Sequence, residues 1–241
     1  RSAFGGEAAP IDYARAIADG AVLALMATLG LLQLGHETTP ELVQLAGAAV
    51  FLYGLACSPF RVWHARVAVL IALSVLAASG APSIGLALAA VGAVICARST
   101  YAPVRRLVPW IIVAALLAAG LAAALGGWTW RVGSMRSASQ LWSVVRQLIW
   151  FTWPAWPLAL WTLWRWRAHL THRHIAVPLA GVLVPLGASL AMGGSDRALL
   201  LALPALAVLS SFALPTLQRS TAAAIDWFSV FFFSACAIAI W

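Results

Sequence analysis

The stretch that organises this chain reads Gly35-His36-Glu37-Thr38-Thr39-Pro40-Glu41, and an apolar run of about membrane length lies on each side of it. The run before it covers residues 17–34, and the run after it covers residues 41–57. A helix that crosses a bilayer needs roughly 20 mostly apolar residues. The stretch therefore predicts a short polar loop between two membrane-spanning helices.

The same alternation of long apolar runs and short polar loops continues along the chain, which is 63% hydrophobic and only 9% charged. Soluble domains are about half apolar and a quarter charged, so the apolar excess here has to face lipid. The sequence predicts an all-α, polytopic transmembrane helical bundle with about nine spans. The nine apolar runs cover residues 17–34, 41–57, 66–81, 84–97, 107–126, 147–164, 174–192, 197–214 and 222–241.

The expected domain organisation is a single transmembrane domain over residues 1–241. Because the sequence opens on Arg1 and stops at Trp241 inside an apolar run, we expect the domain to be part of a longer chain. The third and fourth runs are joined only by Gly80-Ala81-Pro82-Ser83, which is compatible with a tight helical hairpin or with two half-penetrating helices.

The basic residues number 15, all of them arginine, and the net charge is +8. They lie in short loops between apolar runs, a distribution that orients spans and argues against nucleic-acid binding. If residues 1–16 are cytoplasmic, alternation leaves four arginines outside and eleven inside, in agreement with the positive-inside rule. The four outer arginines are Arg131, Arg136, Arg146 and Arg197.

The external loop from Gly126 to Arg146 contains its own periodic pattern. Apolar residues recur at helical spacing at Leu141, Val144, Val145 and Leu148. The polar residues on the other side are Arg136, Gln140, Ser143 and Gln147. This pattern predicts an amphipathic helix that lies in the outer membrane interface.

The polar loop between the first two runs carries the first candidate catalytic residues, Glu37 and His36. A carboxylate beside the bilayer gains proton affinity and can act as a general base toward an acceptor hydroxyl. The alternative is that Glu37 and Glu41 are solvated loop charges. Thr39, Pro40 and Glu41 also have the pattern of a helix start, which would give Glu41 a structural role.

Arg197 opens a late run and is the first candidate for binding a lipid phosphate, because its guanidinium matches phosphate geometry and a helix N-terminus adds backbone donors. Pairing with Asp196, or capping of the helix by Ser195 or Asp196, is the alternative. Arg131 and Arg136 are further candidates for an external anionic ligand, and ordinary contact with lipid headgroups is the simpler explanation for them. The sequence shows no metal-ligand spacing, phosphate-binding glycine loop or serine triad, so neither a metal nor a cofactor is expected.

Two stretches resemble the membrane glycosyltransferases of family 39, which include aminoarabinose transferases of lipid A and protein O-mannosyltransferases. They are Phe151-Thr152-Trp153-Pro154-Ala155-Trp156-Pro157-Leu158-Ala159-Leu160 and Ser195-Asp196-Arg197-Ala198-Leu199-Leu200-Leu201-Ala202-Leu203-Pro204-Ala205-Leu206. The resemblance implies a C-type glycosyltransferase fold in a bacterial inner membrane. It also implies transfer of a sugar from a polyprenyl phosphate donor to an acceptor on the periplasmic side.

The resemblance assigns roles to individual residues. Glu37 matches the second acid of the family, which usually has Asp there, and Arg197 matches a residue that faces the donor phosphate. The family's first acidic loop would lie upstream of Arg1. The partners implied are membrane lipids and the polyprenyl-phosphate sugar, with no nucleic acid. Two alternatives stay open: a non-catalytic membrane subunit, and a transporter of a lipid-linked substrate, although the spans lack the mid-membrane charges typical of transporters.

Overall fold

The computed structural model describes residues 9–36, 38–128 and 138–217, with single helical positions at 223, 227, 230, 231, 234 and 238. All regular structure in these ranges is helical, and they contain no strand. The predicted all-α class is confirmed. The last predicted span, residues 222–241, lies almost entirely outside the described residues.

The helices follow one another through short connections. Their bounds are α1 Pro10–Met26, α2 Leu29–Leu34, α3 Pro40–Cys57, α4 Val62–Ala78, α5 Pro82–Ala97, α6 Ala102–Arg105, α7 Val108–Ala124, α8 Ala138–Phe151, α9 Ala155–Arg165, α10 Arg173–Ala191, α11 Asp196–Leu200 and α12 Leu203–Ser211. Two single turns of 3₁₀ helix, Arg167–His169 and Leu214–Thr216, complete the described structure.

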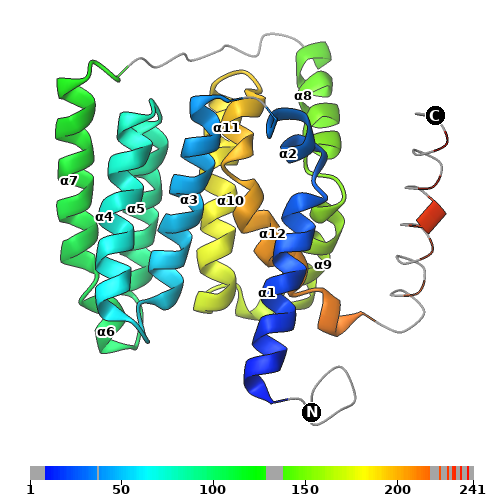
Figure 1. Ribbon diagram of the computed structural model, residues 1–241, viewed down its shortest axis with the longest axis horizontal. Helices are drawn as coiled ribbons and strands as arrows, with labels where there is room; N and C mark the ends of the chain where they lie inside the picture. Colours follow the sequence, from blue (N-terminus) through cyan, green and yellow to red (C-terminus); the bar gives the residue numbers. More distant parts are fainter. Residues whose placement is uncertain are drawn as a thin grey trace.

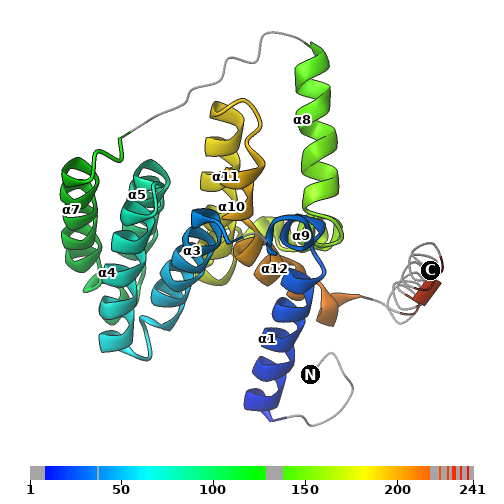
Figure 2. The same cartoon turned by 45° about the horizontal axis from the view of Figure 1, so that its top comes forward.

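The long helices stand side by side in one bundle (Figures 1 and 2). From one edge to the other the order is α7, the α4–α5 pair, α3, α10, α12, and then α1 with α9. The principal contacts join α3 to α4, α4 to α7, α1 and α9 to α12, and α10 to α5 and α12.

The length and composition of these helices are those of a membrane protein. Three helical stretches are long and apolar enough to cross a bilayer: Pro40–Cys57, Ala102–Ala124 and Arg173–Ala191. Three further apolar helices are shorter: Val62–Ala78, Pro82–Ala97 and Leu203–Thr216. The structure therefore supports an integral membrane protein.

Small residues allow the helices at the centre of the bundle to approach closely. A Cβ atom added at Gly54 of α3 would lie 3.1 Å from Val69 of α4, and one at Gly92 of α5 would lie 2.9 Å from the ring of Phe51. Phe51, Val69 and Leu73 are each at most 1% exposed. Close approach of this kind is typical of helices in lipid. Acyl chains are as apolar as the side chains, so van der Waals packing between closely spaced helices replaces the hydrophobic effect.

The third and fourth runs form a helical hairpin. α4 and α5 pack against each other, with Gly80 at a φ of 94° in the turn, and how deeply the pair enters a membrane stays a prediction. A side chain at that backbone conformation would be strained, so glycine is the fitting residue.

Three runs that were predicted as continuous spans are divided in the structure. The run 17–34 breaks between α1 and α2, the run 147–164 breaks between α8 and α9, and the run 197–214 breaks between α11 and α12. Proline accounts for the last two, because Pro154 directly precedes α9 and Pro204 lies in the first turn of α12. At the first break, Thr28 has an extended backbone and the amide of Leu29 donates to the carbonyl of Trp153.

The amphipathic pattern predicted in the external loop forms α8, whose Val144 is buried. α8 packs beside α2, and comparison of Figures 1 and 2 shows it tilted away from the direction of the long bundle helices. Its position in a membrane interface stays a prediction.

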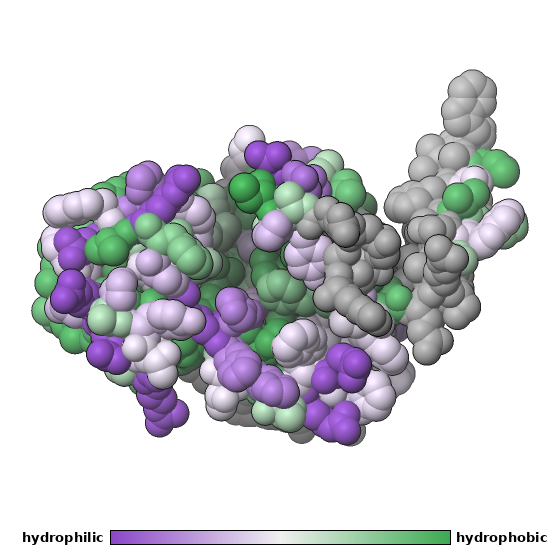
Figure 3. All heavy atoms as spheres, turned by 90° about the horizontal axis from the view of Figure 1, so that it is seen from below, coloured by the Kyte–Doolittle hydropathy of each residue, from purple (hydrophilic) through white to green (hydrophobic). Residues whose placement is uncertain are grey.

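Two ends of the bundle matter for function. The upper end of Figure 1 carries the connections α2–α3, α4–α5 and α10–α11, and the lower end carries the connections α3–α4, α5–α7 and α9–α10. The lower connections contain most of the described arginines, namely Arg61, Arg98, Arg105, Arg106, Arg165 and Arg167, with Arg173 at the start of α10. Viewed from below, this end shows hydrophilic residues around a recess with hydrophobic side chains (Figure 3).

Candidate functional site

A hollow of about 470 Å³ at the upper end combines polar and apolar side chains. It lies between the first turn of α3, the α4–α5 turn and the start of α11. Its lining consists of Glu41, Gln44, Gly80, Ala81, Pro82, Ser83, Ile84, Gly127, Ala188, Met192, Ser195, Arg197 and Ala198. We call it the upper pocket.

The central group of the upper pocket is the carboxylate of Glu41. Its side chain is only 14% exposed, and its Oε1 lies 3.1 Å from Nη1 of Arg197, which is 156 residues away in the chain. Its second oxygen, Oε2, is buried and has no hydrogen-bond partner among the described residues. A buried acceptor without a donor is costly, so Oε2 can accept a hydrogen bond from a ligand.

Local sequence explains how Glu41 reaches this position. Thr39 is extended at the N-cap, and Pro40 opens α3, as the sequence predicted, although the Thr39 side chain makes no capping hydrogen bond. Glu41 therefore lies in the first turn of α3, where the positive end of the helix dipole favours a negative charge. One helical turn later, the Nε2 of Gln44 donates to the carbonyl of Ser79 at 2.7 Å, which ties α3 to the α4–α5 turn.

Arg197 is presented to the pocket by a tight turn after α10. Gly193 and Gly194 have φ values of 75° and 92°, which favour glycine. The Ser195 side chain caps α11 by accepting from the amide of Ala198 at 3.3 Å, so this sequence-based alternative is confirmed. The Arg197 side chain is 63% exposed, and among the described residues its guanidinium bonds only Glu41, through Nη1, which leaves donors for an incoming anion.

Asp196 does not take the role of ion-pair partner that the sequence left open for it. Its Oδ1 accepts from the backbone amide of Arg197 at 2.9 Å, whereas the guanidinium of Arg197 pairs with Glu41. The reason is geometric, because adjacent residues of a helix point in different directions while the first turn of α3 faces α11.

The structure describes only some of the predicted site residues. Arg197 lines the upper pocket, and His36 is exposed in the connection that follows α2. Glu37, Arg131 and Arg136 lie outside the described residues, so their proposed roles stay predictions.

Glu41 is the residue whose importance sequence reasoning missed, because a helix-start role explained it sufficiently. Two signals were present in the sequence. Glu41 and Gln44 are three residues apart and share one helix face, and Arg197 was predicted on the same side of the membrane. An acid and an arginine at the starts of two apolar runs on one side are candidates for a pair.

The described residues offer no evident metal centre, since no group of three or more His, Cys, Asp or Glu side chains in them is arranged to hold an ion. Cys57 and Cys96 are free thiols at partly buried and buried positions, and Cys236 lies outside the described residues. The chemistry available in the upper pocket is therefore that of one carboxylate, one guanidinium and neutral polar groups.

Comparison with protein-family models, curated proteins and solved structures found no match for this chain. The class that the fold defines is an all-helical protein of membrane character, and any more specific function depends on the chemistry of the site.

Proposed function

We propose that this chain belongs to a membrane glycosyltransferase that moves a sugar from a polyprenyl phosphate donor to an acceptor at the upper end. The observation that carries the proposal is the placement of Arg197 beside the largely buried Glu41 in a pocket at one end of an apolar bundle. An anionic donor needs a cation at its phosphate, and an acceptor hydroxyl needs a base. The two short stretches that resemble glycosyltransferase family 39 add support.

The proposed topology has about nine spans, with the lower end cytoplasmic and the upper end periplasmic in a bacterial inner membrane. The gathering of arginines at the lower end supports this orientation, because positive residues favour cytoplasmic loops. Among the described residues, the upper end has Arg146 and Arg197. In this arrangement α8 would lie at the periplasmic interface, since it has the amphipathic pattern of interfacial helices.

The reaction we propose is a displacement at the anomeric carbon of the sugar. The acceptor oxygen forms a new bond to that carbon while the bond to the phosphate oxygen breaks, and polyprenyl phosphate leaves with the electron pair. The acceptor proton passes to a carboxylate, for which Glu41 is placed and Glu37 is a further candidate. Arg197 stabilises the negative charge of the departing phosphate, where catalysis gains most from a fixed cation.

The ion pair gives Glu41 and Arg197 a defined resting state. The exposed guanidinium of Arg197 can turn part of its fork toward a phosphate. As the phosphate takes over Arg197, the Glu41 carboxylate is released from the ion pair and can accept a hydrogen bond from the acceptor hydroxyl. Donor binding would thereby make Glu41 available to the acceptor.

The test is a transfer assay with the native full-length protein in membranes, with a radiolabelled polyprenyl-phosphate sugar as donor. Arg197→Ala and Glu41→Gln should each lower kcat/KM by about 100-fold or more, because each removes charge stabilisation or proton transfer. Arg146→Ala, which removes an arginine outside the upper pocket, is the matched control and should leave transfer near the wild-type rate.

Unchanged transfer by both pocket variants, at normal expression, would contradict these assignments. If membranes that lack the protein still transfer sugar, the chain is not the transferase. If re-expression of the protein in those membranes restores the assembly of another membrane enzyme, the chain is a non-catalytic subunit.

A further inference from the structure

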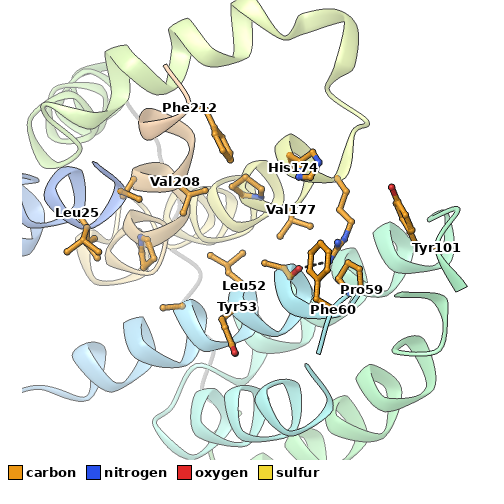
Figure 4. Close-up of a pocket in the computed structure, with 18 residues that line it drawn as sticks. Leu25, Leu52, Tyr53, Pro59, Phe60, Tyr101, His174, Val177, Val208 and Phe212 are labelled. Atoms are coloured by element: carbon orange, nitrogen blue, oxygen red, sulfur yellow. Dashed lines mark hydrogen bonds between the residues drawn. The ribbon is translucent and has the colours of Figure 1, made fainter. Parts of the chain in front are cut away.

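A second hollow, which we call the lower groove, lies at the arginine-rich end and has a volume of about 540 Å³ (Figure 4). Four helices, α1, α3, α10 and α12, contribute most of its walls. Typical small-molecule sites fall between about 300 and 1,000 Å³, so the groove is large enough for a ligand. It shares no lining residue with the upper pocket.

The groove opens sideways because the helices around it pack unequally. α1 packs against α12, and α3 packs against α10 and α12, while α1 and α3 hardly touch each other. The exposed apolar side chains of Val22 and Phe60 lie on its borders, at 56% and 85% exposure. In a membrane this opening faces lipid.

The polarity of the lining changes along the groove. Tyr101, Arg173 and His174 line its lower part, at the end of the bundle where α10 begins (Figure 4). The rest of its lining is apolar and includes Leu25 in the last turn of α1, Ala49 in the middle of α3 and Pro204 in the first turn of α12. A charged end at the membrane surface and an apolar end toward the bilayer centre match the two halves of an amphiphile.

Arg173 is the charged group of this groove, and it has an incomplete set of partners. Its Nη2 donates to the carbonyls of Leu55 and Ala56 and to Oγ of Ser58. Its Nε is buried without a hydrogen-bond partner in the ranges that the structure describes. In the described part of the chain, the ion pairs are Arg15–Asp12 and Arg197–Glu41, so Arg173 has no carboxylate there.

A partly buried guanidinium without a counterion is unfavourable in an apolar environment. Helix C-terminal carbonyls carry only partial negative charge, so those of α3 compensate the cation incompletely. An anion close to Arg173 would supply the missing charge and accept from its remaining donors. The apolar walls exclude a fully hydrophilic anion as the best fit.

We propose that the lower groove binds one anionic phospholipid, whose acyl chain lies between α1, α3, α10 and α12 and whose phosphate contacts Arg173. Arg173, a partly buried cation without a carboxylate in the described part of the chain, favours an anionic over a zwitterionic headgroup, and the exposed arginines of the lower end add a weaker long-range attraction. This lipid site is separate from the proposed donor site and lies at the opposite end of the bundle.

The experiment is native mass spectrometry of the purified full-length protein in detergent, with phosphatidylglycerol or phosphatidylcholine of matched acyl chains added. The wild-type protein should retain one phosphatidylglycerol about tenfold more strongly than phosphatidylcholine, as one charge-assisted contact allows. Inorganic phosphate at millimolar concentration should not displace it, because free phosphate lacks the acyl chain that fills the groove.

Two variants test the two halves of the site. Ala49→Phe fills the apolar part and should lower phosphatidylglycerol retention by about tenfold or more, whereas Ala90→Phe on the exposed face of α5 should not. Arg173→Gln should remove the preference for the anionic lipid, while Arg98→Gln, an exposed arginine at the same end, should keep it.

The proposal is overturned if Ala49→Phe retains phosphatidylglycerol as well as Ala90→Phe does, or if a folded Arg173→Gln variant keeps the full headgroup preference of the wild type. If Arg173→Gln does not fold, the Ala49→Phe comparison decides alone. Displacement of the bound species by inorganic phosphate would show a simple anion site, and a retained peptide or second protein chain in place of lipid would also reject the proposal.

Discussion

The two ends of this bundle each place an arginine at the start of a helix that borders a hollow, but they compensate its charge in different ways. Arg197 of the upper pocket pairs with a carboxylate and has a side chain that is 63% exposed. Arg173 of the lower groove is held by two carbonyls and one hydroxyl of the α3 end, and the described residues give it no acid.

The difference has a chemical consequence. When an anion binds, Arg197 can exchange its carboxylate partner for that anion. The upper pocket therefore suits a reaction in which negative charge moves from one group to another. A lone guanidinium fixed to backbone carbonyls has no alternative partner, so the lower groove suits permanent binding of an anion. Under the two proposals, the same residue type would support turnover at one end and bind a structural ligand at the other.

The largest effect is expected where one substitution disturbs both ends. Gly181 lies in α10, which borders both hollows, and a Cβ atom there would lie 2.8 Å from Ala205 of α12 and from Leu52 of α3. Gly181→Leu should therefore lower the free energy of unfolding by about 3 kcal/mol or more and weaken both sites. Dodecyl sulphate titration measures the unfolding, and lipid retention and sugar transfer report the two sites.

The control is Gly187→Ala on the same helix, where the added Cβ would meet no other described part of the chain within 4 Å beyond the local backbone of α10. It should unfold at nearly the wild-type detergent concentration. Equal loss of stability in the two variants would show that close packing of α10 is unimportant.

A smaller effect separates the lower end from the upper end. Arg173→Gln removes the hydrogen bonds that join the start of α10 to the end of α3, and it should lower the free energy of unfolding by about 2 kcal/mol. Added phosphatidylglycerol should stabilise the wild type more than the variant, since a ligand stabilises the folded state in proportion to how tightly that state binds it. Melting temperatures with and without the lipid measure both effects, and a variant as stable as the wild type would contradict the structural role.

The smallest effect concerns the ion pair of the upper pocket. Because Arg197 is well exposed, its coupling to Glu41 should be about 0.5–1 kcal/mol in a double-mutant cycle of Glu41→Gln and Arg197→Ala. Arg197→Ala should cost more stability than Glu41→Gln, because it leaves a nearly buried carboxylate without its cation. Strictly additive effects would mean that the pair contributes nothing to stability, and high salt should reduce the coupling.

The arrangement of helices was largely readable from the sequence where one apolar run forms one helix. The runs 41–57 and 174–192 correspond closely to α3 and α10, because length and apolarity alone favour a helix in lipid. The runs 17–34, 147–164 and 197–214 are each divided, since hydropathy does not register a turn inside an apolar segment. Pro154 and Pro204 were visible markers of two of these breaks, whereas the break at Thr28 follows from packing against the α8–α9 connection.

The candidate site was predicted in part. Arg197 was identified from its residue type and its position at the start of an apolar run, and the structure places it in the upper pocket. Its pairing with Glu41 was not foreseen, because periodicity describes one helix at a time and the two residues come from helices distant in the chain. The lower groove was not foreseen for the same reason, since it arises from the unequal packing of α1, α3, α10 and α12.

The sequence by itself determined the helical class, the membrane character and the gathering of arginines at one end, because these depend on composition and local spacing. Only the tertiary structure decided which charges meet. Because of the way α3, α10 and α11 pack, Glu41 forms an ion pair with Arg197, whereas Arg173 has no acidic partner among the described residues. Contacts between distant segments depend on shape complementarity over the whole bundle, and no local pattern in the chain encodes them.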